Sequence, residues 1–165
     1  MITVRQVSSD DWREWRDLRL AALSEAPYAF GSRLADWQGD GDSEQRWRER
    51  LTSVPFNVIA DLGGIPGGMA SGTLTEGDAE LTSMWVAPFA RGSGVGDALI
   101  QAVLQWASTV NPIRVILGVK EGNDRAIALY VRHGFVDDGR DEEASHCGET
   151  SERRMILRED PHPDS

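Results

Sequence analysis

Residues 79–119 carry the pattern that most restricts how this chain can fold. An alternating stretch at 79–86 leads through a loop with three glycines into an amphipathic segment at 93–109, and a short apolar run follows at 113–119. Alternation predicts a strand, helical spacing of apolar residues predicts a helix, and a short apolar run predicts a strand buried on both faces. A helix that connects two strands of one sheet brings them together as parallel neighbours. These residues therefore predict a mixed α/β sheet that contains a parallel pair.

The other segments extend this crossover into a full order of elements. Tight turns between alternating stretches predict an antiparallel meander before it, and a strand and two helices precede the meander. The first helix has caps at Ser8–Asp10, and Asp42 or Ser43 caps the second. We expect about seven strands, at residues 2–7, 56–62, 69–75, 79–86, 113–119, 134–139 and 152–158, flanked by about four helices, at 8–26, 43–51, 93–109 and 124–132.

Length and composition limit the class of protein. No repeat, low-complexity block or linker interrupts the pattern, which favours one domain over residues 1–165 with 158–165 as a frayed tail. The formal net charge of −10 argues against a nucleic-acid partner, since such partners need clustered Lys and Arg. No apolar run approaches the roughly 20 residues that span a bilayer, and the N-terminus does not read as a signal peptide, so we expect no membrane contact and a cytoplasmic location. A single cysteine and three histidines without ligand-like spacing predict neither a disulfide framework nor a metal site.

The loop Arg91–Gly96 places glycines 92, 94 and 96 at the start of an expected helix. Two familiar phosphate motifs fail here: a dinucleotide fingerprint begun at Gly92 needs a glycine where Asp97 stands, and a P-loop needs Gly-Lys-Ser/Thr, whereas the only lysine is Lys120. Glycines permit positive φ and close backbone approach, so amide N–H groups and the helix N-terminus can face an anion such as a pyrophosphate. The alternative is a tight turn between strand and helix that binds nothing.

Two motifs resemble those of a known family. RGSGVG, at Arg91–Gly96, resembles the R/Q-x-x-G-x-G/A loop of the GNAT superfamily of acyl-CoA-dependent N-acetyltransferases, and the VAP sequence before it, at 86–88, resembles that family's strand end. Residues 123–135, NDRAIALYVRHGF, resemble the second signature, an Asn, then Ala, then Leu-Tyr, then Gly-Phe. The element order is similar over residues 2 to about 158, with motif-level support from about 79 to 135. The resemblance implies a GNAT-like α/β (α+β) fold with a mixed, mostly antiparallel central sheet.

The resemblance also implies an activity. It points to an acyltransferase that moves an acetyl group from acetyl-CoA to a primary amine by direct attack in a ternary complex, without a metal. In the family the glycine loop faces the pyrophosphate, a backbone N–H near the strand end polarises the thioester carbonyl, and the Asn contacts the pantetheine or pyrophosphate arm. The residues so assigned to acetyl-CoA are Trp85, Val86, Arg91, Gly92, Ser93, Gly94, Val95, Gly96, Asn123 and Tyr130. For Asn123 the alternative is a helix cap.

Tyr130 lies on the stripe that its helix is expected to bury. It follows Ala126 and Leu129 at helical spacing, and Gly134 is placed to end the helix in a left-handed C-cap. The residues alone favour a core tyrosine whose hydroxyl finds a carbonyl. The resemblance instead implies that this tyrosine donates a hydrogen bond or a proton to the departing CoA thiolate, which makes Tyr130 the candidate general acid.

The reaction also needs a base, because an ammonium group with a pKa near ~10 has no lone pair for attack. Glu80 resembles in position a strand glutamate that serves as base, often through water, in several GNAT enzymes; a solvated strand-end carboxylate is the alternative. Cys147, with His146 beside it, is a poor candidate for a covalent route. Adjacent residues in an extended segment point to opposite faces, and the surrounding sequence is typical of a polar loop.

The acceptor pocket of GNAT proteins is built by the first two helices with their connection, the fourth strand and the loop between the last two strands. Here these segments supply the acidic stretch 137–143, and they supply the candidate acceptor contacts Tyr28, Phe30, Trp37, Glu80 and Ser83. Aromatic rings and carboxylates suit a cationic amine, although each ring fits a place in the core equally well. We expect a small-molecule amine acceptor. A protein N-terminus or lysine side chain, and a non-catalytic acyl-CoA-binding module, are the alternatives, and a homodimer is left open.

Overall fold

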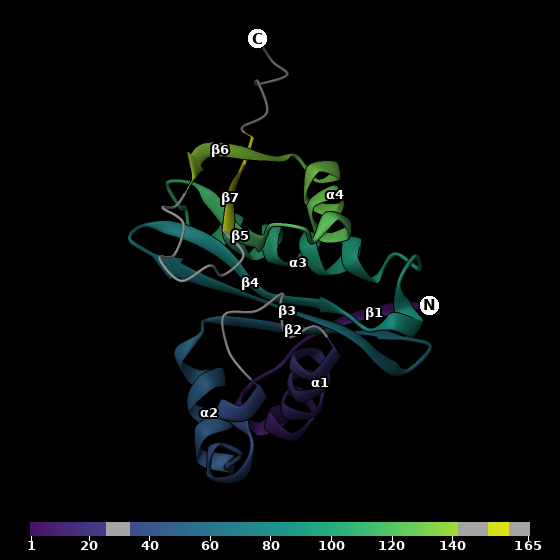
Figure 1. Ribbon diagram of the computed structural model, residues 1–165. Helices are drawn as coiled ribbons and strands as arrows, with labels where there is room; N and C mark the ends of the chain where they lie inside the picture. The colour runs from purple at the N-terminus through teal and green to yellow at the C-terminus, as the bar shows by residue number, and fades with distance from the viewer. Residues whose placement is uncertain (26–33, 142–151, 159–165) are drawn as a thin grey trace.

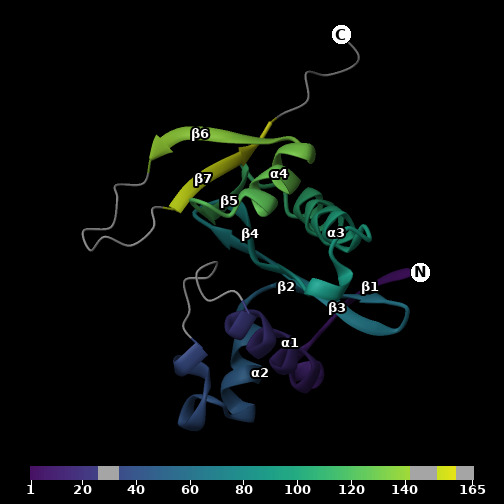
Figure 2. The same ribbon diagram turned by 45° about the vertical axis from the view of Figure 1, so that its right-hand side comes forward.

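A computed structural model of the chain describes residues 1–25, 34–141 and 152–158. The strands form one seven-stranded sheet in the order β1-β2-β3-β4-β5-β7-β6. Helices α1 and α2 cover one face of this sheet and α3 and α4 cover the other (Figures 1 and 2). The strands are β1 (Ile2–Gln6), β2 (Phe56–Leu62), β3 (Ile65–Thr75), β4 (Asp78–Val86), β5 (Val115–Lys120), β6 (Phe135–Asp141) and β7 (Glu152–Leu157). The helices are α1 (Trp12–Glu25), α2 (Glu44–Ser53), α3 (Val95–Thr109) and α4 (Asp124–Arg132).

Strands β4 and β5 form the one parallel pair among the described strands, as the crossover predicted. They pair only over Ala79–Leu81 and Val115–Leu117 and then part. Near this point β4 also bulges against β3, and Ser83 takes a positive φ of 55° at the bulge. A bulge bends the strand that carries it. The mixed, mostly antiparallel sheet with four flanking helices is thus confirmed, and it opens on one side of β4.

The hairpin between β2 and β3 is tighter than expected. Gly63 and Gly64 alone make the turn, with φ of 61° and 85°, so β3 begins at Ile65 instead of residue 69. Two successive positive φ values suit the right-handed twist of a two-residue hairpin, which explains the glycine pair. Pro66 is tolerated in β3 because it lies at a register shift, before the pairing with β4 begins.

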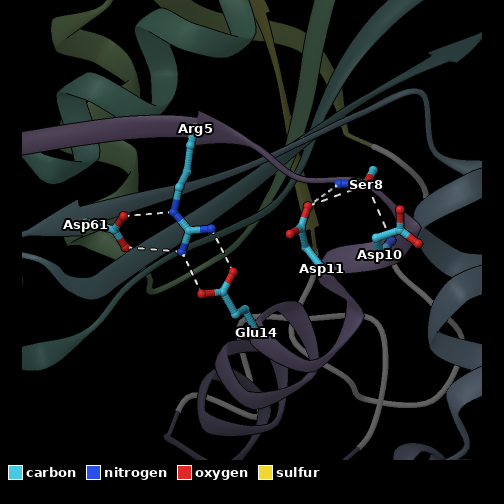
Figure 3. A network of polar contacts seen from close by, with 6 residues as sticks. All are labelled: Arg5, Ser8, Asp10, Asp11, Glu14 and Asp61. Atoms are coloured by element: carbon cyan, nitrogen blue, oxygen red, sulfur yellow. Dashed lines mark hydrogen bonds and ion pairs between the residues drawn. The ribbon is translucent and has the colours of Figure 1, made fainter.

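The start of α1 is fixed by short-range polar contacts (Figure 3). Ser8 Oγ accepts from Asp10 N at 3.3 Å, and Asp11 Oδ2 accepts from Ser8 N at 2.9 Å. This capping box opens a single 3₁₀ turn that leads into the helix. Nearby, Arg5 of β1 donates to Asp61 of β2 at 2.8 Å and to Glu14 of α1 at 2.7 Å. Of the predicted caps at Ser8–Asp10, Ser8 is the N-cap, and α1 is tied to the sheet edge beside it.

The connection from α1 to α2 contains two short 3₁₀ turns, Leu34–Trp37 and Gly39–Gly41, that the sequence pattern did not predict. The N-cap of α2 is Ser43, whose Oγ accepts from Arg46 N at 3.2 Å. Asp42, the other predicted cap, instead accepts hydrogen bonds from side chains of both helices. Of the two expected caps, Ser43 is therefore the right one.

Two apolar clusters hold the helices to the sheet. Alternation along β2 sends Val58 and Ala60 toward α3 and α4, and sends Ile59 toward α1 and α2. The second cluster buries Trp15 and Trp47 completely. Both helix layers are thus packed on the sheet, and the region where β4 leaves β5 lies between them.

Candidate functional site

A cleft of about 980 Å³ opens where β4 and β5 part. Its walls are the second half of β4, the loop and first turn of α3, the end of β5, and α4 with the residues before it. Open parallel sheets bind ligands at the carboxyl ends of strands where neighbouring strands diverge. The cleft lies where β4 and β5 diverge, and it is therefore the candidate binding site.

The glycine loop forms one wall of this cleft. Gly92 and Gly94 have φ of 80° and 98°, and Gly94 is the N-cap of α3. Because glycine has no side chain, the N-cap residue makes no side-chain hydrogen bond to the first turn of α3, and the N–H groups of that turn have no intrahelical partners. Gly96 lets the helix pack closely, since a Cβ there would lie 2.9 Å from a methyl group of Leu129. The loop thus presents backbone amides and a helix N-terminus to the cleft, which suits an anion.

Two residues of the predicted loop do not line the cleft with their side chains. Val95 is fully buried in the core beneath α3, so only its backbone amide is in place for a ligand. The hydroxyl of Ser93 turns back and donates to the carbonyl oxygen of Ala90. The other assigned residues, from Trp85 and Val86 through Arg91, Gly92, Gly94 and Gly96 to Asn123 and Tyr130, all border the cleft.

Arg91 is held by two contacts at the edge of the cleft. Its Nε donates to the carbonyl oxygen of Val86 at 3.1 Å, and its Nη2 donates to both carboxylate oxygens of Glu25 at 2.9 Å. Glu25 also accepts from Trp85 Nε1 at 2.9 Å. The indole N–H of Trp85 and then the guanidinium of Arg91 hold the pKa of Glu25 below its usual range. Sequence reasoning missed Glu25, because its partners lie 60 and 66 positions away and no local motif marks it.

Tyr130 belongs to both the core and the cleft. It is 6% exposed, packs edge-on against Phe135 with ring centroids 6.0 Å apart, and borders the cleft. Its hydroxyl makes no hydrogen bond within residues 1–25, 34–141 and 152–158, so it is open to a ligand. Burial raises the pKa of Tyr130, which keeps the phenol protonated at neutral pH. The core location that the residues alone favoured is confirmed, but without the expected carbonyl partner.

Asn123 stands at the start of α4 and borders the cleft. Asn123 holds the N-cap position, but its side chain makes no capping hydrogen bond to the helix. Gly134 ends α4 with a φ of 96°, as predicted. Next to it, His133 Nε2 lies 2.7 Å from Asp97 Oδ1, which also accepts from Arg132 at 2.8 Å and so ties α4 to α3.

Glu80 and Tyr130 line different cavities. Glu80 borders a second cavity of about 340 Å³, and Thr75 Oγ1 donates to its carboxylate at 3.4 Å. Gly118 borders both cavities, so they are neighbours across the end of β5. The structure therefore places Glu80 beside the cleft and not in its wall.

The predicted acceptor contacts are only partly brought together. Ser83 borders the cleft, and its hydroxyl accepts from Arg50 Nη2 at 3.1 Å. Trp37 packs against Trp47 with ring centroids 4.4 Å apart, under the guanidinium of Arg46, and borders neither cavity. Tyr28 and Phe30 lie outside the described residues, as do His146, Cys147 and the end of the acidic stretch from 142 onward. The acceptor side is thus the part of the site that the described residues define least.

Within the described segments, no group of three or more His, Cys, Asp or Glu side chains is arranged to hold a metal ion. None of the helices described is long and apolar enough to cross a membrane.

Comparison with known sequences gives a family match. A model of the acetyltransferase (GNAT) family matches residues 9–135. A Mycobacterium tuberculosis protein called an uncharacterized N-acetyltransferase is 37% identical over 62 residues, which are 38% of this chain and 40% of that protein. The chain thus matches less than half the length of this curated relative.

Comparison with solved structures gives the same fold. An acetyltransferase of the GNAT family from Streptococcus pneumoniae has a TM-score of 0.74 at 19% identity, over 96% of this chain and 100% of that one. A spermidine N-acetyltransferase from Vibrio cholerae, in complex with CoA and spermine, has a TM-score of 0.72 at 21% identity, over 94% of each chain. The ribosomal-protein-S18-alanine N-acetyltransferase of Escherichia coli has a TM-score of 0.67 at 19% identity, over 95% of this chain and 93% of that one. At these identities the likeness shows the fold alone.

Proposed function

Because this chain belongs to the acetyltransferase (GNAT) family, we propose that it moves an acetyl group from acetyl-CoA to a primary amine in a ternary complex. The observation that carries the proposal is the cleft at the parting of β4 and β5. It has the N-terminus of α3, with its glycine N-cap, on one wall and Tyr130, whose hydroxyl has no hydrogen-bond partner in the described segments, on another. A cleft so built offers amides for an anion and a proton donor for a leaving group within one cavity.

The donor binds along the glycine loop in this proposal. The amides at the start of α3 and the guanidinium of Arg91 face the pyrophosphate, and Asn123 contacts the pantetheine or pyrophosphate arm. The backbone N–H near Val86 polarises the thioester carbonyl, a task that needs an amide rather than a particular side chain. Trp85 supports the same strand end.

Direct transfer then follows from these placements. The amine nitrogen attacks the thioester carbon, a C–N bond forms, and the C–S bond breaks as the thiolate leaves. Tyr130 donates a hydrogen bond or its proton to that sulfur. Before the attack, Glu80 takes the ammonium proton of the acceptor through water, which the neighbouring second cavity has room to hold, so that the neutral amine is the nucleophile.

The acceptor in this proposal is a small-molecule amine. The Vibrio cholerae neighbour is a spermidine N-acetyltransferase, and Glu76, Asp78, Glu80 and Glu152 around the second cavity outnumber its arginines. A protein N-terminus or lysine is the second candidate, since the Escherichia coli neighbour acts on an alanine of a ribosomal protein. A non-catalytic acyl-CoA-binding module is the third. The cytoplasmic location and a homodimer stay predictions.

The test is release of free CoA thiol when purified protein meets acetyl-CoA and a library that contains polyamines, other small amines and peptides with free N-termini. We expect turnover on a small amine. Turnover on peptides alone would favour the second candidate, and tight binding of acetyl-CoA without turnover would favour the module. No binding of acetyl-CoA would contradict all three.

Two glycine variants supply a matched control. Gly94→Val puts a β-branched residue at a φ of 98° in the loop, and Gly64→Val puts the same residue at a φ of 85° in the β2–β3 turn. Both variants strain the backbone by about 1–2 kcal/mol. Only Gly94→Val is expected to weaken acetyl-CoA binding, which separates the loop's role from a general loss of stability.

A further inference from the structure

We propose that Glu25 is a positioning residue of the acyl-donor site, which holds Arg91 ready for the pyrophosphate and steadies the strand end at Trp85 and Val86. The inference rests on the proposed function, because it assumes that acetyl-CoA occupies the cleft. Glu25 itself lies outside both the glycine loop and the second signature, and it is the last residue of α1.

The contacts of Glu25 close a ring of side chains around Val86. One carboxylate joins the indole N–H of Trp85 to Nη2 of Arg91, both at 2.9 Å, and Nε of Arg91 returns to the carbonyl oxygen of Val86 at 3.1 Å. Trp85 and Val86 are adjacent in β4, so the ring brackets the peptide group between them. That peptide carries the N–H of Val86, the proposed donor to the thioester carbonyl.

The strand end needs such support because β4 has lost one neighbour there. Beyond Leu81 it no longer pairs with β5, and it bulges at Ser83, so it is held by β3 on one side only. A donor in an oxyanion site works only when it is held in position before the charge develops. The carboxylate of Glu25 reaches this strand end from α1, through Trp85 directly and through Arg91, which itself donates to Val86.

Arg91 is held in a geometry that leaves one terminal nitrogen for a ligand. Its Nε and Nη2 are committed to Val86 and Glu25, whereas Nη1 makes no hydrogen bond in the described part of the chain. A free arginine side chain loses rotamer entropy on binding a phosphate. Fixing it beforehand reduces that cost, which is the general advantage of preorganisation.

The negative charge of Glu25, taken alone, would have the opposite effect on acetyl-CoA affinity. A carboxylate beside a pyrophosphate site repels the ligand, and the low pKa of Glu25 keeps it ionised at neutral pH. Removing the charge should therefore tighten acetyl-CoA binding if Glu25 has only an electrostatic effect. Removing the charge should weaken binding if Glu25 positions Arg91. The two hypotheses therefore predict changes of acetyl-CoA affinity in opposite directions.

The experiment measures acetyl-CoA affinity by calorimetry at neutral pH for wild type, Glu25→Gln and Glu25→Asp. The Gln variant removes the charge, and the Asp variant keeps the charge on a side chain one methylene too short to reach both partners. We expect about fivefold weaker binding for each, because the pair is partly exposed and such pairs contribute up to about 1 kcal/mol. Binding by either variant that equals or exceeds wild type would overturn the proposal.

Glu14→Gln is the matched control. Glu14 lies on the same helix, and its carboxylate also accepts two guanidinium nitrogens, from Arg5 at 2.7 and 3.2 Å (Figure 3). It does not line the cleft. The Glu14→Gln variant therefore removes one negative charge and one ion pair of α1, as Glu25→Gln does. We expect its acetyl-CoA affinity to stay within about twofold of wild type.

A double variant separates positioning from loss of structure. In an Arg91→Ala background there is no guanidinium to position, and the amide oxygen of the introduced glutamine can still accept from Trp85 Nε1. Glu25→Gln should then leave only the relief of repulsion and should strengthen binding relative to Arg91→Ala alone. A purely structural role for Glu25 predicts weaker binding in both backgrounds, and that outcome would also overturn the proposal. If wild-type protein itself fails to bind acetyl-CoA, the proposed function fails instead.

Discussion

At the scale of single residues, the proposed chemistry depends most on Tyr130, which is buried beside the cleft and whose hydroxyl has no hydrogen-bond partner among the described residues. Tyr130→Phe keeps the ring and its packing on Phe135. If Tyr130 supplies a proton to the leaving thiolate, kcat on a confirmed acceptor should fall by roughly 10²-fold or more. Burial raises the phenol pKa, whereas a thiol has an ordinary pKa near ~8.5, so a hydrogen bond to the sulfur without full transfer is the milder alternative. That alternative predicts a loss of about tenfold.

Acetyl-CoA affinity is the control for this variant and should change little, because the hydroxyl acts on the sulfur only as the bond breaks. A hydroxyl without a hydrogen-bond partner also contributes little to stability, so the melting temperature of Tyr130→Phe should stay close to that of wild type. A wild-type kcat in Tyr130→Phe would mean that Tyr130 has only a structural role and that the thiolate leaves without a proton or hydrogen bond from it.

Glu80 is the second residue whose role can be measured directly. If it takes the amine proton through water, Glu80→Gln should lower kcat/KM near neutral pH and recover part of the rate at higher pH, where more of the acceptor is already deprotonated. Glu76→Gln is the matched control, since Glu76 borders the same cavity but lies in the turn before β4. A wild-type pH profile in Glu80→Gln would remove Glu80 from the mechanism.

At the scale of elements, Asp42 joins α1 and α2, the two helices that cover one face of the sheet. Its carboxylate accepts from Arg16 Nε of α1 at 2.7 Å and from Trp47 Nε1 of α2 at 2.8 Å. The guanidinium of Arg16, and then the indole N–H of Trp47, lower the pKa of Asp42 to about 2. The folded pKa lies below the unfolded one, so the stabilisation is complete above about pH 4 and is lost as pH falls toward 2.

Asp42→Asn should therefore lower the melting temperature at neutral pH and lessen its fall between about pH 4 and 2. Thermal unfolding followed by circular dichroism across that range is the measurement. Asp17→Asn is a suitable control, because Asp17 also pairs with Arg16, at 2.8 Å, but its side chain is 71% exposed and joins no second helix. Equal acid sensitivity in wild type and Asp42→Asn would show that other carboxylates dominate the transition.

Elements were easier to predict from the sequence than contacts, for a physical reason. Periodicity reports which face of a segment is buried, and that is local, so the seven strands, the crossover and the caps at Ser8 and Ser43 were predictable. The start of β3 was wrong because one glycine pair makes the turn and the next glycines join the strand. Glu25, Arg50 and the aromatic packing of Trp37 could not be found in this way, since each depends on residues brought near by the fold.

At the scale of the whole molecule, the parting of β4 and β5 leaves the sheet open around the cleft, and a donor bound there contacts elements from both sides of the opening. The apolar clusters share the strands β2 to β4, so we predict that residues 1–165 unfold in one cooperative transition.

Acetyl-CoA at 100 times its dissociation constant should stabilise the folded state by about 2.7 kcal/mol. For a chain of this length that raises the melting temperature by about 5–10 °C. Differential scanning calorimetry checks both claims, with Gly64→Val expected to show the same rise from a lower starting temperature and Gly94→Val expected to show a much smaller one. Two resolved transitions would contradict the single domain, and an equal rise in both glycine variants would place the donor away from the loop that opens α3.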